Sequence, residues 1–160
     1  MRVRLIENAS VVDFINELRR MLNDGIYNTA VRQAAIDATA STGVGNDLGI
    51  FRYIKAHFSY VPDPYERELV MAPRLMIEAI ETDGVTHGDC DDVSLLAAAM
   101  YGSIGSESKI VLCDEHYDGV IDHAIACVRD ASGNWLDADL SGNVPLGWVS
   151  SYTNRVDICP

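Results

Sequence analysis

A cysteine, a histidine and an aspartate, each in or next to an apolar segment, are the residues of this chain that could do chemistry together. Cys90 stands in the stretch Gly88–Asp92, which runs directly into an apolar, Ala-rich segment. That pattern is typical of a cysteine in the first turn of a buried helix. His123 lies in an apolar run further along, and Asp137 and Asp139 follow it. A nucleophile, its base and the group that orients the base are arranged in this way in cysteine-based acyl-transfer enzymes.

The surroundings of Cys90 both favour and oppose a reactive thiolate. The N-terminus of a helix carries partial positive charge, and a histidine from the strands could form an ion pair with the sulfur. Asp89, Asp91 and Asp92 are like charges that disfavour a thiolate unless they point away or are paired. We expect structural roles for them instead, with Asp89 as the helix cap and Asp91 or Asp92 stabilised by the helix dipole.

The base and its orienting group are expected on strands. His123 shares a strand face with Ile125 and Cys127, where a histidine can also be an ordinary core residue. Asp137 and Asp139 are two residues apart, so a strand places both on one face. Either aspartate could then reach a neighbouring imidazole, and either could instead be a solvated strand end.

Helices precede strands along the chain. Apolar residues recur at helical spacing in five segments, at about 10–24, 29–42, 46–58, 73–80 and 90–103, the first stopped by Asp24-Gly25. A loop is predicted at 81–88, and strands at 1–6, 109–113, 123–128, 135–140 and 155–159. This order predicts an α+β fold in a single domain over residues 1–160, with a helical part to about 105 and a sheet part from about 106.

Composition narrows the function classes. The formal net charge is −12, which is unsuited to a phosphate backbone, so we expect no nucleic-acid partner. The sequence has no apolar run of membrane-spanning length and no signal-like start, which predicts a soluble, cytoplasmic protein without a membrane partner. No cysteine pair has the CxxC spacing, so we expect free thiols, with Cys113 and Cys127 in the core.

Taken together, these segments resemble the transglutaminase-like superfamily over about residues 34–141. Gly88-Asp89-Cys90-Asp91-Asp92 is similar to the Gly-Asp-Cys-Asp/Glu-Asp form of bacterial and phage-borne members, and the Ala-rich helix follows it. His123–Cys127 resembles the family's His-led strand. Trp135–Ser141 resembles its Trp-x-x-x-Asp-Pro-Thr strand, with Leu140-Ser141 in place of Pro-Thr. The resemblance implies a papain-like core in which Cys90 is the nucleophile, His123 the base and Asp139 the third member.

One part of the expected machinery is not evident in the sequence. The backbone N–H of Cys90 supplies one oxyanion donor, but a second is not apparent. Gln33 is the single glutamine and lies far upstream, which leaves His87 or a tyrosine. No calcium loop of regular aspartate spacing is present, so we expect no metal and no cofactor.

Three hypotheses follow from these residues. The first is a cysteine hydrolase or acyl transferase that acts on amide bonds of a protein or peptide substrate through Cys90, His123 and Asp139. The second is a catalytically inactive binding or assembly module that keeps the triad residues, motivated by the acidic run and the missing oxyanion donor. The third is a zinc site formed by His87, Cys90, His123 and Asp139.

Overall fold

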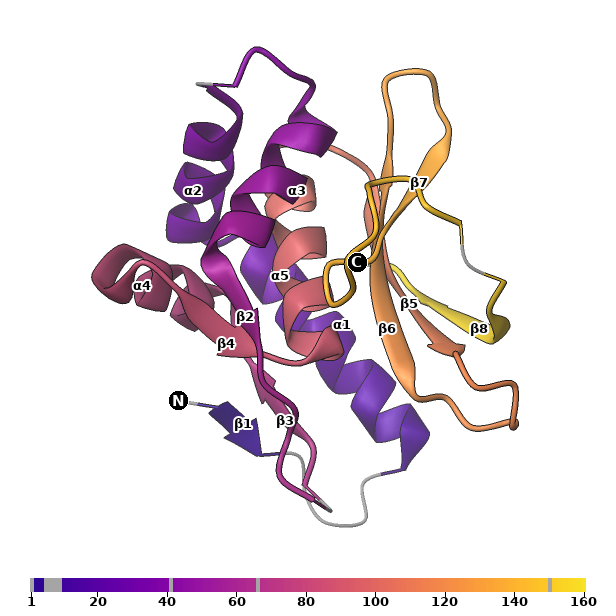
Figure 1. The fold of residues 1–160 in the computed structure, drawn as a ribbon. Coiled ribbons are helices and arrows are strands. Elements are labelled where there is room, and N and C mark those ends of the chain that lie inside the picture. Colours follow the sequence, from indigo (N-terminus) through magenta and orange to yellow (C-terminus); the bar gives the residue numbers. More distant parts are fainter. Residues whose placement is uncertain (1, 5–9, 41, 66, 150) are drawn as a thin grey trace.

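The computed structural model describes residues 2–4, 10–40, 42–65, 67–149 and 151–160. It is α+β, as the sequence predicts, with helices first and an antiparallel sheet second (Figure 1). The helices are α1 Val11–Ile26, α2 Thr29–Ala40, α3 Asn46–His57, α4 Pro73–Asp83 and α5 Cys90–Ser103. The strands are β1 Arg2–Arg4, β2 Phe58–Tyr60, β3 Leu69–Met71, β4 Thr86–Gly88, β5 Ser108–Asp114, β6 His123–Arg129, β7 Trp135–Ala138 and β8 Thr153–Ile158.

Helix α5 is the centre of the core. Its residues from Asp91 to Tyr101 are all buried, because α1, α2, α3 and α4 pack around it and strand β6 covers its remaining side. A helix that is apolar all round is stable only in such a position. In Figure 1 α2 and α4 lie on the side of α5 away from the large sheet, whereas α1 runs towards the lower end of β6. The Ala-rich sequence keeps these neighbours close.

The large sheet has the order β7-β6-β5-β8, and every pairing in it is antiparallel. Its β6 strand fixes the register of the site, since His123 pairs with Cys113 of β5 and Cys127 pairs with Asp137 of β7. The Ser94 hydroxyl, one turn into α5, donates a hydrogen bond of 3.0 Å to the Ala124 carbonyl. This bond sets the start of α5 against the start of β6.

Two short sheets were not expected from the sequence. The segment 81–88, predicted as a loop, ends in strand β4, which pairs in parallel with β2. Strand β3 was also missed, and it pairs with β1. Three residues are too few to show an alternating pattern. The predicted edge strand at 1–6 is present at Arg2–Arg4, while Met1 and residues 5–6 lie outside the described residues.

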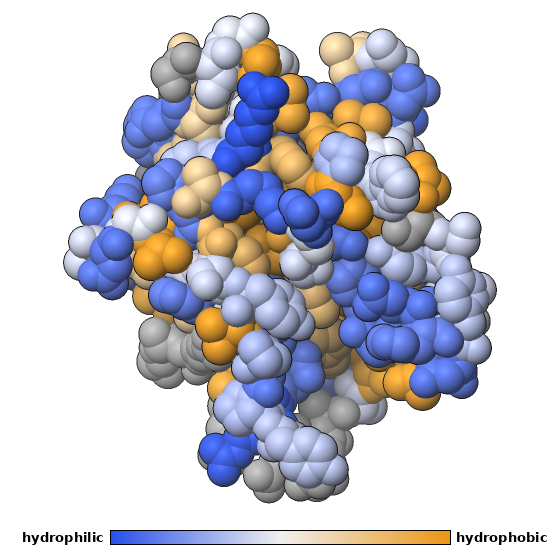
Figure 2. Space-filling view, viewed as in Figure 1, coloured by the Kyte–Doolittle hydropathy of each residue, from blue (hydrophilic) through white to orange (hydrophobic). Residues whose placement is uncertain are grey.

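Among the predicted boundaries that differ from the structure, two matter for the packing and for the site. Helix α1 continues through Gly25, which packs against α5 and α4 rather than ending the helix: a Cβ there would lie 2.8 Å from Ala99 Cβ. Strand β7 ends at Ala138, two residues earlier than predicted, so Asp139 lies outside the ladder. Among the described residues, no helix combines the length and apolar character needed to cross a membrane. Figure 2 shows hydrophilic and hydrophobic residues interspersed on the face that Figure 1 presents.

Candidate active site

Cys90 is the first residue of α5 and is held there by a capping box. The Asp89 carboxylate accepts a hydrogen bond from the Asp91 N–H at 3.3 Å, and the Asp92 carboxylate accepts one from the Asp89 N–H at 3.2 Å. The expected capping role of Asp89 is therefore confirmed. Gly88 is required before the cap, because a Cβ at that position would lie 2.6 Å from Asp92 Cβ. Cys90 itself is partly exposed.

His123 and Asp139 form a direct pair. His123 opens strand β6 and is 8% exposed, and Asp139, also 8% exposed, follows the end of β7. The distance from His123 Nε2 to Asp139 Oδ2 is 3.0 Å. Because Asp139 occupies Nε2, Nδ1 is the ring nitrogen left to face another group. The structure thus brings together the histidine and one of the two aspartates that the sequence singled out.

Two further hydroxyl groups hold Asp139. Ser141 Oγ donates to Oδ1 at 2.8 Å, and the Tyr152 hydroxyl donates to Oδ2 at 2.9 Å. The Tyr152 ring also lies beside the imidazole, with ring centroids 5.5 Å apart. Tyr152 was missed in the sequence because it precedes the last strand without any motif around it. Only the fold brings Tyr152, just before β8, to Asp139, just after β7, because these two strands are opposite edges of one sheet.

The Asp137 carboxylate is committed elsewhere. It stays in register with Cys127, whose Sγ lies 3.2 Å from Asp137 Oδ1, and Arg155 lies 3.6 Å from the same oxygen. Burial and this carboxylate raise the pKa of Cys127 above its usual value, so the thiol keeps its proton. Asp137 therefore does not reach His123. Cys113 is buried as well, and burial raises the pKa of its thiol to about 12.

The His123–Asp139 pair is charged at neutral pH. Burial opposes charging of the imidazole, but hydrogen bonds to Asp139 and Cys90 outweigh it and raise the pKa of His123 to about 10. Burial likewise opposes ionisation of Asp139, but its bonds with His123, Ser141 and Tyr152 lower its pKa to about 2. An imidazolium that hydrogen-bonds both a carboxylate and a cysteine is the arrangement that a thiolate nucleophile needs.

The Glu115 carboxylate lies near Nδ1 of His123, the ring nitrogen that Asp139 leaves open. Glu115 Oε2 lies 4.0 Å from His123 Nδ1, and its side chain is half-exposed. An ion pair with an exposed carboxylate contributes little free energy, so Glu115 stabilises the imidazolium less than the buried Asp139 does. It is nevertheless a second negative group on the side of the ring that faces Cys90.

Tyr60 is a tyrosine that the fold places near Cys90. It ends strand β2, where it pairs with Gly88, two residues before Cys90. Burial, and then the charge of Cys90, raise the pKa of Tyr60, so its hydroxyl is protonated and can donate. The other candidate donor, His87, is exposed on β4. Gln33 lies on α2 and bonds Asp37.

The zinc hypothesis does not fit the arrangement. Within the described part of the chain, the groups able to hold a metal are Asp63, Glu68 and Asp89, and Asp89, Asp91 and Asp92. Neither group contains a histidine or Cys90, and both offer carboxylate oxygens only. Zinc prefers nitrogen and sulfur ligands.

Comparison with known proteins adds little to this geometry. No family model matches the chain, and no curated protein matches it. One solved structure is similar, "a Putative Cysteine Protease from Cytophaga hutchinsonii", with a TM-score of 0.49 and 16% identity. The similarity covers 96% of this chain and 59% of that one, so this chain spans about three fifths of its length. A likeness this remote carries no information about activity.

Proposed function

We propose that this protein is a transglutaminase-like cysteine hydrolase or acyl transferase that acts on amide bonds of a protein or peptide. The observation that carries the proposal is the buried His123–Asp139 pair, 3.0 Å apart, with Cys90 as the other partner of the imidazole. This is the order nucleophile, base and orienting carboxylate, and it is built from three separate elements of the fold.

In the proposed reaction the Cys90 sulfur attacks the amide carbonyl and forms a tetrahedral intermediate. His123 gives its proton to the leaving amine as the carbon–nitrogen bond breaks, which leaves a thioester on Cys90. His123 then takes a proton from water or an incoming amine, which attacks the thioester, and the carbon–sulfur bond breaks to release the Cys90 thiolate beside the imidazolium. Asp139 keeps the imidazole oriented and stabilises its charged form throughout.

We further propose that the oxyanion is bound by the Cys90 backbone N–H and the Tyr60 hydroxyl. The first N–H groups of a helix have no partner within the helix, so this donor is available for a substrate. Tyr60 is half-exposed and neighbours Cys90, which suits a group that meets substrate at the surface. This assignment would supply the donor that the sequence did not reveal.

The alternative is an inactive binding or assembly module. The acidic start of α5 and the approach of Glu115 to His123 favour it, because both disfavour a thiolate at Cys90. The two functions differ in whether Cys90 is reactive, and that difference is measurable without knowing a substrate.

The experiment is a screen of peptide and side-chain amides with wild type, Cys90→Ala and Cys90→Ser. Hydrolysis or amine transfer by wild type, abolished in Cys90→Ala, would support the enzyme. Turnover that persists in Cys90→Ala would refute the assignment of the nucleophile. Circular dichroism of each variant checks that α5, whose first residue is changed, still folds.

A further inference from the structure

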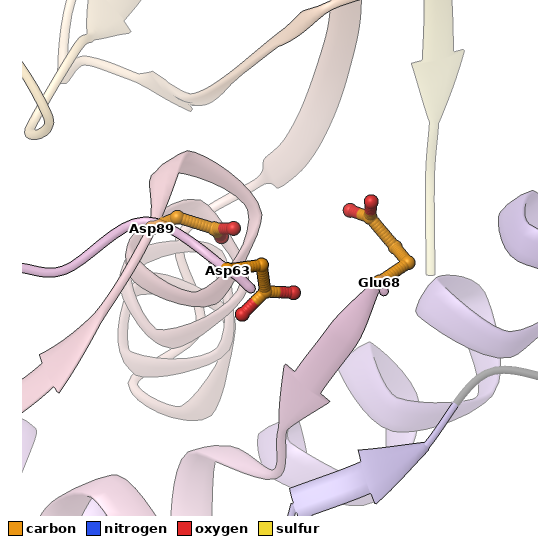
Figure 3. A group of neighbouring side chains, drawn as sticks. All are labelled: Asp63, Glu68 and Asp89. Carbon is orange, nitrogen blue, oxygen red and sulfur yellow. The ribbon is translucent and has the colours of Figure 1, made fainter. Parts of the chain in front are cut away.

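Four carboxylates converge on one side of the α5 N-terminus. Oxygens of Asp63, Glu68 and Asp89 all lie within 4.8 Å of one another, and so do those of Asp89, Asp91 and Asp92. Figure 3 shows that the Asp63, Glu68 and Asp89 carboxylates face a common space between the start of α5 and strand β3. Asp92 is already occupied, since it accepts hydrogen bonds from the Met71 and Asp89 N–H groups. The candidate ligands are therefore Asp63, Glu68, Asp89 and Asp91. Asp63 and Asp89 each accept a backbone N–H as well, which a carboxylate can combine with a cation because it has about four acceptor sites.

The burial of Asp91 is a second, independent observation that points to a bound cation. It is only 3% exposed, and neither of its carboxylate oxygens has a hydrogen-bond partner. The groups that approach it are the carboxyls of Asp89 and Glu68, which are acceptors when ionised. A buried carboxylate without a donor or a cation is costly, so native structures rarely keep one.

Two segments that are distant in the sequence form the cluster: the one between β2 and β3, and the start of α5. The Asp63 carboxylate accepts a hydrogen bond from the Leu69 N–H, which closes the segment between β2 and β3 and brings Glu68 near Asp63. The capping box fixes Asp89 at the start of α5. No Lys or Arg pairs with Glu68, Asp89 or Asp91 in the part of the chain that the structure describes.

We propose that Asp63, Glu68, Asp89 and Asp91 bind one calcium ion at the N-terminus of α5. The donor set is purely oxygen, which suits a hard cation rather than zinc. Calcium–oxygen distances of about 2.3–2.6 Å place ligands across the ion about 5 Å apart, which fits the Asp63, Glu68 and Asp89 oxygens within 4.8 Å of one another. Asp91 adjoins this set through Asp89, since oxygens of these two residues also lie within 4.8 Å. Calcium is favoured over magnesium because it accepts several carboxylates in irregular geometry, whereas magnesium keeps most of its water.

This site is distinct from the reaction proposed above and does not depend on it. Two of its ligands, Asp89 and Asp91, flank Cys90 in sequence. Among the described residues, none of the four forms a hydrogen bond with His123 or Asp139. The ion would join the segment between β2 and β3 to α5. It is a binding proposal, and its tests use binding and stability rather than turnover.

The first test is calorimetric titration of calcium chloride into the full chain after chelator treatment, with magnesium chloride as the comparison. We expect one calcium per chain, a melting temperature that rises with calcium concentration, and weaker binding of magnesium. No heat and no thermal shift at millimolar calcium would overturn the proposal. Equal binding of magnesium would overturn the choice of ion.

Variants place the ion. Glu68→Gln changes an exposed ligand without changing its shape, and we expect roughly ten-fold or greater loss of calcium affinity, since affinity follows the number of charged ligands. Asp91→Asn should cause a similar loss. Asp24→Asn, an exposed carboxylate paired with Arg20 on α1, is the matched control and should bind as wild type does. Calcium affinity unchanged in Glu68→Gln would refute the site even if Asp91→Asn failed to fold.

The competing explanation of Asp91 is a proton instead of an ion. Burial and the neighbouring Asp89 raise its pKa well above the usual value, so a protonated Asp91 would also relieve the cluster. In that case calcium titrations would show no binding heat. The melting temperatures of wild type and of Asp91→Asn would both be independent of calcium concentration. A calcium-dependent rise in wild type that is absent in Asp91→Asn excludes this explanation.

Discussion

Two buried aspartates, Asp139 and Asp91, have opposite surroundings. Asp139 is 8% exposed and receives hydrogen bonds from His123, Ser141 and Tyr152, and its pKa falls to about 2. Asp91 is 3% exposed and receives none, and its pKa rises. Burial alone therefore does not decide whether a carboxylate is charged. The donors around it do, and they separate a group that can orient a base from one that needs a proton or a cation.

The largest effect is expected from removing the charge of Asp139. Asp139→Asn keeps the shape but loses the negative partner of the imidazolium, so we expect turnover to fall by roughly 10⁴-fold, as for the orienting carboxylate of other triads. The pKa of His123 should fall well below about 10. NMR titration of the His123 ring in wild type and variant measures this. A wild-type midpoint near the ordinary 6.5 would contradict the charged pair.

The pH dependence of stability follows with a definite sign. The folded pKa of His123 is raised, so its contribution is complete below 6.5 and is lost as pH rises towards about 10. The folded pKa of Asp139 is lowered, so its contribution is present above 3.8 and is lost as pH falls towards about 2. Asp91 acts in the opposite direction to Asp139, because its raised pKa means that ionisation above 3.8 opposes folding.

A second test separates oxyanion binding from the ion pair. Tyr60→Phe removes only a hydroxyl, and we expect turnover to fall about 100- to 1,000-fold, the usual cost of one oxyanion donor. Labelling of Cys90 by a small thiol reagent should be unchanged, because the imidazole is untouched. Tyr65→Phe, another exposed tyrosine, is the control. Wild-type turnover in Tyr60→Phe would remove Tyr60 from the site.

A smaller effect is expected at Tyr152. Tyr152→Phe leaves Asp139 with two donors, so the free energy of unfolding at neutral pH should fall by about 1–3 kcal/mol, the range for a hydrogen bond to a charged group. Urea unfolding measures the change, with Tyr117→Phe as an exposed control. The loss should shrink at low pH, where Asp139 becomes protonated. A loss that is equal at all pH values would mean that Tyr152 acts by packing alone.

The smallest change in the free energy of unfolding, and one of opposite sign, is expected for Asp91→Asn in the absence of calcium. Asp91→Asn removes a buried carboxylate that has no donor, so the calcium-free protein should be as stable as wild type or more stable at neutral pH. Asp139→Asn should be less stable under the same conditions. Equal destabilisation by both substitutions in urea would show that the two aspartates do not differ in the way proposed.

Much of the fold was predictable because its long elements have clear periodicity. The apolar spacing in α1 and the unbroken apolar run in α5 identify an outer and a central helix, and the β5 and β6 segments read as strands. Strand β4 was not predictable, since three residues carry no period. The alternation of side chains along a strand predicted that Asp137 and Asp139 share one face. In the structure β7 ends at Ala138, so Asp139 lies beyond the strand and reaches His123.

The parts of the site that the sequence did not reveal depend on distant segments. Tyr152 reaches Asp139 only because β8 lies in the same sheet, on the far side of β5 from β6. The carboxylate cluster joins Asp63 and Glu68 to Asp89 and Asp91, and no regular spacing links the two segments. Short-range patterns therefore located Cys90 and His123, but not the groups that surround them.

The most direct test of the central proposal is alkylation of Cys90 by iodoacetamide below the ordinary thiol pKa of about 8.5. Exposed Cys159 serves as the reference within the same molecule, and peptide mass spectrometry reads both rates at a fixed calcium concentration. We expect Cys90 to react faster than Cys159 in wild type and to lose that advantage in His123→Ala. Labelling of Cys90 no faster than Cys159 in both proteins would contradict a working Cys90–His123–Asp139 triad.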